Sequence, residues 1–189
     1  MAKFTAFFDA CVMVPIAPSD TYLRMAELGA FRPTWSQKVI EEAVSALIRI
    51  HPGENPSLFQ SRFRAMNTAF DDAMVTGWEP LVAGLALPDD GDRHVLAAAI
   101  RSRADVIVTE NTKHFPDHAL KPFDIKAVRL DDFLLDQLDL NPAAAVSVVR
   151  EQARDMSRPP VKLEHLLDRL ARSGARRFAE AVREHADME

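Results

Sequence analysis

One stretch constrains the fold more than any other: residues 87–115, which read LPDDGDRHVLAAAIRSRADVIVTENTKHF. Three carboxylates come first, then an apolar helical segment that begins near Asp92, and then the apolar run Val106–Val108. Polar side chains follow at Thr109–Asn111. A turn, a helix, a short buried strand and polar groups at its carboxyl end are typical of an α/β sheet. Because open α/β sheets bind ligands at the carboxyl ends of their strands, this stretch indicates a ligand site.

Strands and helices alternate along the first two thirds of the chain. The apolar patterns predict buried strands over residues 3–8, 31–34, 81–87, 106–109 and 126–129. They predict three further helices, over 21–28 after a cap at Ser19 or Asp20, over 36–50 after Ser36, and from Ser57 through Phe59, Phe63, Met66, Phe70 and Met74. Such alternation gives βαβ units, so we expect residues 1–130 to form an α/β domain with a parallel sheet.

The remaining residues, 131–189, have a different pattern. The sequence predicts only helices there: one capped by Asp131, one after Asn141-Pro142, one on Leu163, Leu166, Leu167 and Leu170, and a last one with Phe178, Ala181 and Val182. Arg158-Pro159-Pro160 and Ser173-Gly174 are the expected breaks. We therefore predict a small all-helical C-terminal domain.

Composition narrows the classes of protein. The chain has 189 residues and a single cysteine, Cys11, which excludes an internal disulfide and a multi-cysteine zinc site. No apolar run approaches the roughly 20 residues that cross a bilayer, so we expect a cytoplasmic protein without a membrane association. The net charge of −5 argues against general attraction to nucleic acid, but a carboxylate-based nuclease is acidic at its centre.

Two acids are expected to meet at one edge of the sheet. Asp9 ends the first strand, and Asp92 begins the helix before a later one. Grouped acids repel unless a cation or proton compensates, and oxygen ligands favour Mg²⁺ or Mn²⁺ over zinc. A third acid is available on the helix after Ser36, but Glu41 and Glu42 flank its apolar face almost symmetrically, so the helical wheel does not choose between them.

Four segments together resemble a known family. FFDACVMV, SQKVIEEAVSAL, LPDDGDRHVLAAAI and VIVTENTKHFP follow the order and approximate spacing of the PIN-domain ribonucleases, especially the VapC-type toxins of toxin–antitoxin pairs. The resemblance covers residues 4 to about 130, and LDDFLLDQL with the helices behind it resembles the helical C-terminal extension of one subgroup. It implies a three-layer PIN-like domain with a parallel sheet flanked by helices.

The resemblance also implies site residues. Asp9, Glu42 and Asp92 match the family's first three acids, and Asn111 falls where an Asp is frequent. Asn carries no charge, and Asp89 is a candidate to supply the negative charge that is missing at this position. The expected metal ligands are thus Asp9, Asp92, Asp89 and Glu42, the last directly or through water.

The implied activity is hydrolysis of RNA phosphodiester bonds, in tRNA or rRNA, with Mg²⁺ or Mn²⁺ lowering the pKa of a water and stabilising charge on the phosphate. Thr109 is expected to orient Asn111 or a water, and Arg93 and His94 to meet the substrate. The family further implies a cognate small antitoxin and a homodimer.

Alternatives remain for several residues. Asp89 and Asp90 fit simple turn roles, and Asp92 a helix cap. Cys11 fits a small buried hydrophobe. The basic stretch from Arg169 to Arg183 fits either an RNA contact or a solvated face with ion pairs.

Three other functions compete with the nuclease. A dehalogenase-type phosphatase needs a second Asp two residues after Asp9, where this chain has Cys11. A receiver domain needs an acidic pair near the end of the first strand, but Ala10 follows Asp9. Both functions are therefore weakened. A catalytically inactive PIN-like module that binds RNA or a partner stays open because of Asn111.

Overall fold

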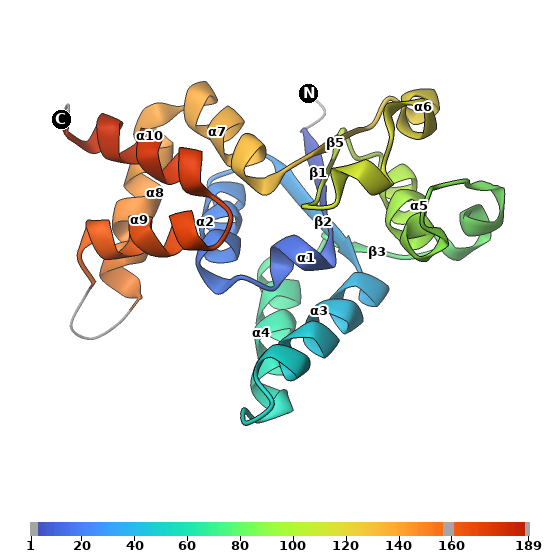
Figure 1. Cartoon of the computed structure of the whole chain (residues 1–189), viewed down its shortest axis with the longest axis horizontal. Helices are drawn as coiled ribbons and strands as arrows, with labels where there is room; N and C mark the ends of the chain where they lie inside the picture. Colours follow the sequence, from blue (N-terminus) through green and yellow to red (C-terminus); the bar gives the residue numbers. More distant parts are fainter. Residues whose placement is uncertain (1–3, 157–160, 188–189) are drawn as a thin grey trace. The chain divides into compact units, whose positions relative to one another are not determined.

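The computed structural model describes residues 4–156 and 161–187. The chain divides into two compact units, one formed by residues 1–14 and 31–128 and the other by residues 15–30 and 129–189. The first unit contains a sheet and its helices, and the second contains helices (Figure 1). The predicted break at Arg158-Pro159-Pro160 lies outside the described residues.

The first unit is built on a five-stranded parallel sheet. Its strands are β1 (Thr5–Phe8), β2 (Arg32–Ser36), β3 (Met74–Val75), β4 (Val106–Val108) and β5 (Lys126–Val128). They lie in the order β3-β2-β1-β4-β5, and Phe7 of β1 is in register with Thr34 of β2 on one side and Ile107 of β4 on the other. All residues of β1 and β4 are buried, as expected for a parallel sheet covered on both faces. The predicted fold class, an α/β domain with a parallel sheet flanked by helices, is confirmed.

Helices connect these strands. They are α1 (Ala10–Met13), α3 (Gln37–Ile50), α4 (Pro56–Ala69), α5 (Arg93–Ser102) and α6 (Asp117–Leu120), with short 3₁₀ turns η1 (Glu79–Gly84), η2 (Asp90–Asp92), η3 (Thr112–His114) and η4 (Lys121–Phe123). Right-handed crossovers place the helices before β3 on one face and those after it on the other, and Figure 1 shows α5 and α6 on one side of the strands and α1, α3 and α4 on the other. The order reverses between β1 and β4, where α/β sheets bind ligands.

The second unit contains five helices within the described residues: α2 (Ile16–Glu27), α7 (Leu130–Leu140), α8 (Pro142–Asp155), α9 (Leu163–Arg172) and α10 (Arg176–Asp187). A buried hydrogen bond from the Thr21 hydroxyl to Gln152 Oε1, at 2.6 Å, joins α2 to α8. Gly174 takes φ 98° between α9 and α10, a conformation that favours glycine. The units separate close to the predicted boundary at residue 130, but residues 15–30 group with the C-terminal helices.

Local capping explains which helix predictions are right. Ser36 caps α3 by accepting a hydrogen bond from the N–H of Val39 at 3.3 Å, as predicted. Asn141 caps α8 in the same way through the N–H of Ala144, at 3.2 Å.

Four predicted elements are wrong in place or type. Of the strand expected over 81–87, residues 81–84 lie in the 3₁₀ turn η1 and residues 85–87 have no regular structure. The third strand is β3, beside which the Ala73 carbonyl accepts the N–H of Trp35. The helix expected to be capped by Ser57 and to run through Met74 is instead capped by Asn55, begins at Pro56 and ends at Ala69. Helix α2 begins at Ile16 rather than at Thr21, with Pro18 in its first turn, where a missing N–H is tolerated. Asp131 lies inside α7 and does not cap that helix.

Candidate active site

Asp9 lies directly after β1 and is fixed by two strong contacts. Its side chain is buried, with 6% exposed. Oδ1 accepts a hydrogen bond from the N–H of Ala10 at 2.7 Å, so Asp9 caps α1. Oδ2 accepts a hydrogen bond from the hydroxyl of Thr109, also at 2.7 Å. Because Thr109 follows β4, the carboxyl ends of the two central strands are joined through this carboxylate.

Cys11 supports the same carboxylate. Its thiol donates to Asp9 Oδ2 at 3.3 Å, and its sulfur accepts the N–H of Glu110 at 3.3 Å. Burial, and next the charge of Asp9, raise the pKa of the Cys11 thiol to about 12. The thiol therefore stays protonated and remains a donor. The interpretation of Cys11 as a small buried hydrophobe missed these contacts. The contact with Glu110 depends on the segment after β4 and has no local sequence signal.

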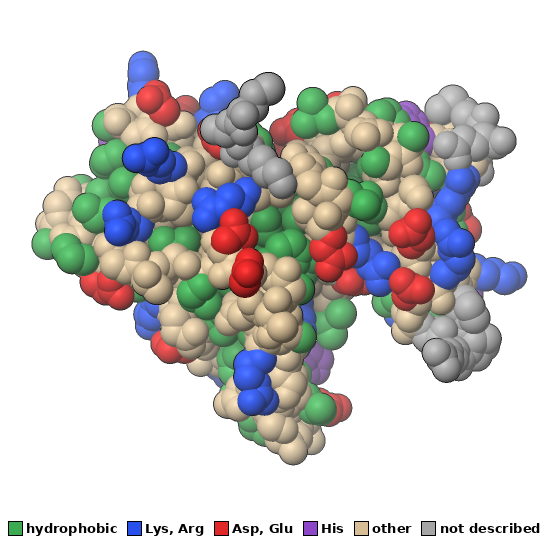
Figure 2. Space-filling view, turned by 180° about the vertical axis from the view of Figure 1, so that it is seen from behind, with side chains coloured by type: hydrophobic (Ala, Val, Ile, Leu, Met, Phe, Trp, Pro, Cys, Tyr) green, Lys and Arg blue, Asp and Glu red, His purple; other side chains and the backbone are tan. Residues whose placement is uncertain are grey.

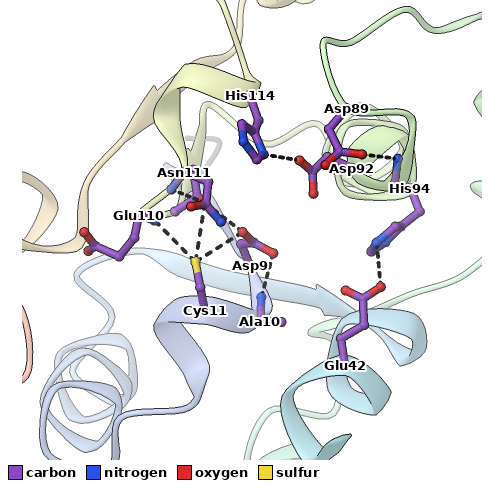
Figure 3. A network of polar contacts seen from close by, with 12 residues as sticks. Asp9, Ala10, Cys11, Glu42, Asp89, Asp92, His94, Glu110, Asn111 and His114 are labelled. Carbon is purple, nitrogen blue, oxygen red and sulfur yellow. Dashed lines mark hydrogen bonds and ion pairs between the residues drawn. The ribbon is translucent and has the colours of Figure 1, made fainter. Parts of the chain in front are cut away.

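Asp92 stands at the N-terminus of α5, but its side chain makes no capping hydrogen bond there. Asp92 Oδ2 instead lies 2.7 Å from Nδ1 of His114, in η3. Asp89, Asp92 and His114 each offer a possible metal-ligand atom, and these atoms lie within 4.8 Å of one another. Asp89 also accepts the N–H of Gly91 at 2.8 Å, so its turn role and a ligand role are both compatible with its position. Figure 3 shows Asp9 across from this group.

The electrostatics connect Asp92 to the other two acids. Burial raises the pKa of the Asp92 carboxyl, and the negative charges of Asp9 and Asp89 raise it further, against the lowering contribution of His114. Three carboxylates thus share one electrostatic environment at the carboxyl edge of the sheet. A cation in this position would relieve their repulsion.

Glu42 has a different environment. Its Oε1 lies 3.0 Å from Nε2 of His94 and 3.6 Å from Nζ of Lys38. Burial acts to raise the pKa of Glu42, but the hydrogen bond and charge of His94 and the charge of Lys38 lower it overall. His94 is buried beside Trp78, with ring centroids 5.9 Å apart. Glu42 is therefore one member of a pair with a histidine, and Figure 3 shows its carboxylate directed at His94.

Glu41, the other acid left open by the helical wheel, is exposed and accepts a hydrogen bond from Gln37. This difference favours Glu42 as the acid of α3 at the site. The predicted ligand set of Asp9, Asp92, Asp89 and Glu42 itself remains a prediction.

The residues predicted to contact substrate differ in exposure and in their present partners. Thr109 is fully buried, and its Oγ1 accepts the N–H of Asn111 at 3.1 Å. Asn111 is exposed at the same edge. Arg93 is half-buried and forms an ion pair with Asp90 in the preceding turn. The ring of His94 is paired with Glu42, which does not favour a contact with phosphate. The phosphate contact of His94 stays a prediction.

The basic C-terminal stretch forms ion pairs within its own unit. Arg177 pairs with Asp131 and Asp132, and Arg183 pairs with Glu164 at 2.8 Å. The face shown in Figure 2 likewise has acidic and basic side chains interspersed. These contacts favour the solvated-face interpretation over an RNA contact.

Comparison with known proteins places this geometry in a family. A family model described as PIN domain matches residues 5–113, more than half of the chain. The chain belongs to the PIN-domain family. A second model, described as the VapC50 C-terminal domain, matches residues 130–184. The resemblance expected from the sequence, to VapC-type PIN-domain proteins with a helical extension, is thereby confirmed.

A named relative supports the assignment. The chain is 58% identical over 79 residues to a protein of Mycobacterium tuberculosis (strain ATCC 25618 / H37Rv) named "Putative ribonuclease VapC50". The matched segment covers 42% of this chain and 47% of that protein, so the match spans about half of the relative's length. No solved structure matches the chain. Among the described residues, this PIN-domain chain has no helix long and apolar enough to cross a membrane.

Proposed function

We propose that this chain is a metal-dependent endoribonuclease, the toxin of a type II toxin–antitoxin pair, which hydrolyses phosphodiester bonds of tRNA or rRNA. The observation that carries the proposal is the placement of Asp89 and Asp92, which offer ligand atoms within 4.8 Å of each other, across from Asp9 at the point where the strand order of the sheet reverses (Figure 3). The name of the relative, a ribonuclease, supports the choice of RNA over other phosphodiesters.

The donor set fits a divalent cation. Asp9, Asp92 and Asp89 offer carboxylate oxygens, Glu42 a fourth from α3, and their mutual repulsion is a cost that a cation would remove. Oxygen donors fit Mg²⁺ or Mn²⁺. When bound, such a cation activates water and stabilises the charge that develops on a scissile phosphate.

The chain's own residues would prepare the site for this reaction. Thr109 and Cys11 fix the carboxylate of Asp9, so its geometry is set before substrate arrives. Asn111 is exposed beside Thr109, where its amide can meet a phosphate or a cation. By resemblance to the family, the expected products have a 5′-phosphate and a 3′-hydroxyl, and the expected partners are a small antitoxin, a second copy of the chain and an RNA in the cytoplasm.

The test is cleavage of total cellular RNA by the purified chain with Mg²⁺ or Mn²⁺. We expect discrete products from the wild type, and none from Asp92→Asn or with EDTA. Asp117→Asn removes an exposed carboxylate of α6 and is the matched control, expected to cleave like the wild type. Products that persist in Asp92→Asn would contradict the assignment.

One rival function is favoured by two observations. Asn111 brings no charge to the site, and Glu42 is already paired with His94, which fits a PIN-like module that binds RNA or a partner without cleaving. Binding of Mn²⁺ to the wild type and its loss in Asp92→Asn would support the nuclease. RNA binding without Mn²⁺ binding or cleavage would support the module.

A further inference from the structure

We propose that His114 is a positioning residue for Asp92: its imidazole holds one carboxylate oxygen and so keeps the other available to a cation. The proposal rests on the metal site of the proposed function and adds a residue to it. Asp92 Oδ2 lies 2.7 Å from His114 Nδ1. Within the described part of the chain, Asp92 Oδ1 has no hydrogen-bond partner, and Figure 3 shows His114 and Asp92 side by side, across from Asp9.

The backbone of α5 does not hold the carboxylate of Asp92. An Asp in an N-cap position has an extended backbone, from which its carboxylate accepts the first free N–H groups of the helix. Asp92 instead ends η2 with φ −90° and ψ −3°, which is helical, and its side chain makes no capping hydrogen bond. The contact with His114 is therefore what fixes the orientation of this carboxylate. Without it, the carboxylate would be free to rotate about its side-chain bonds.

His114 is well placed to hold this contact. It ends η3, where its own N–H donates to the Asn111 carbonyl at 2.9 Å, and the next residue, Phe115, is 2% exposed and anchors the turn in the core. The side chain of His114 is itself 27% exposed, so the ring is accessible from the site without being loose on the surface.

The segment after β4 thus supports both central acids. Thr109, at its start, donates to Asp9 Oδ2, and His114, at its end, contacts Asp92 Oδ2, each at 2.7 Å. Removing a residue that hydrogen-bonds a metal ligand typically weakens metal affinity by about 10–100-fold.

The experiment measures Mn²⁺ binding by the full chain, from the signal of free Mn²⁺ in electron paramagnetic resonance. We expect His114→Ala to weaken binding by about 10–100-fold. His114→Asn should restore much of the affinity, because its amide nitrogen lies at the same branch of the side chain as Nδ1 and can donate to Asp92. His118→Ala, which removes an exposed histidine of α6, is the matched control and should bind like the wild type.

Two further measurements separate the outcomes. Circular dichroism shows whether each variant is folded, and pulsed resonance detects coupling between bound Mn²⁺ and an imidazole nitrogen. Equal affinity of folded His114→Ala and wild type would overturn the proposal. A nitrogen coupling that disappears in His114→Ala would also overturn it, by making His114 a direct ligand. Absence of Mn²⁺ binding by the wild type would instead contradict the proposed function.

Discussion

The carboxyl group of Asp92 lies where burial and two neighbouring charges disfavour its ionisation, and these raise its pKa above the value of an unfolded Asp despite the contact with His114. A carboxyl whose pKa is raised by folding costs stability when it is ionised, so the penalty is present above the folded pKa and absent below the unfolded value of 3.8. A binding site commonly carries such a cost. In this chain the cost falls on a residue that we assign to cation binding.

Asp92→Asn should therefore stabilise the metal-free protein near neutral pH. The amide is uncharged and can still accept a hydrogen bond from His114. We expect Tm in EDTA to rise; in a chain of this size each kcal/mol of added stability raises Tm by about 2–4 °C. The gain should shrink as the pH falls toward 3.8. Added Mn²⁺ should raise Tm of the wild type and not of the variant. A lower Tm for Asp92→Asn in EDTA would show that the acid cluster is not under strain.

Cys11 is expected to be unreactive in the folded chain. Because burial and the charge of Asp9 raise its pKa to about 12, little thiolate exists near pH 8, and thiolate is the reactive form. Alkylation by iodoacetamide should be more than about a hundredfold slower than in the urea-unfolded chain, where the pKa returns to its ordinary range. Intact mass reads the result directly, since the chain has one cysteine. Rapid labelling of the folded chain would contradict the contacts with Asp9 and Glu110.

At the scale of elements, one side chain caps a helix far from it in sequence. Asp131, in the first turn of α7, accepts the N–H groups of Arg177 at 3.1 Å and Phe178 at 2.9 Å, at the start of α10. Sequence reasoning placed Asp131 as the cap of its own helix. The sequence correctly indicated that Asp131 caps a helix, but it indicated the wrong helix. A capping residue can be recognised in the sequence only when the helix that it caps follows it directly.

Asp131→Ala should cost about 1 kcal/mol of stability, the typical value for a lost helix cap. Asp132→Ala is the matched control: it removes the neighbouring carboxylate, which contacts Arg177 only through an exposed ion pair, and exposed pairs contribute little. Urea unfolding measured by circular dichroism distinguishes the two, and equal midpoints for both variants would argue against the capping role.

The same distinction explains what the sequence predicts well. Ser36 and α3, Asn141 and α8, and the buried runs of β1 and β4 are local patterns, and they appear where expected. The apolar run over residues 81–87 did not become a strand, because strand formation depends on an adjacent partner and β3 occupies the edge beside β2. A short apolar run does not contain that information.

In the candidate site, too, local features could be predicted from the sequence and long-range contacts could not. The placement of Asp9 and Asp92 followed from their positions at the ends of strands and helices. The contacts of His114 with Asp92, and of His94 with Glu42, join residues 22 and 52 positions apart. No spacing rule predicts these pairs, since they depend on how the segment after β4 and the helix α5 pack in three dimensions.

At the scale of the whole molecule, the two compact units are not separated by a single boundary in the sequence. Residues 15–30 contain α2, which belongs with the C-terminal helices: Thr21 hydrogen-bonds Gln152, and Arg24 pairs with Asp155 at 2.9 Å. A chain that ends near residue 130, where the sequence predicts the domain boundary, would keep α2 and lose its partners α8 and α9.

Truncation after Val128 should therefore give a chain that aggregates and binds hydrophobic dyes, because the apolar face of α2 is left uncovered. Replacing residues 15–30 of that truncated chain by a Gly/Ser segment of the same length removes the uncovered face and leaves the first unit intact. We expect this second chain to be soluble, with a cooperative thermal transition by circular dichroism. If the simple truncation is as soluble and cooperative as the linker version, then α2 does not depend on the C-terminal helices, and residues 1–130 fold as the single domain that the sequence predicts. If both aggregate, the first unit needs the helical one for its own stability, and the two units are not independent folding units.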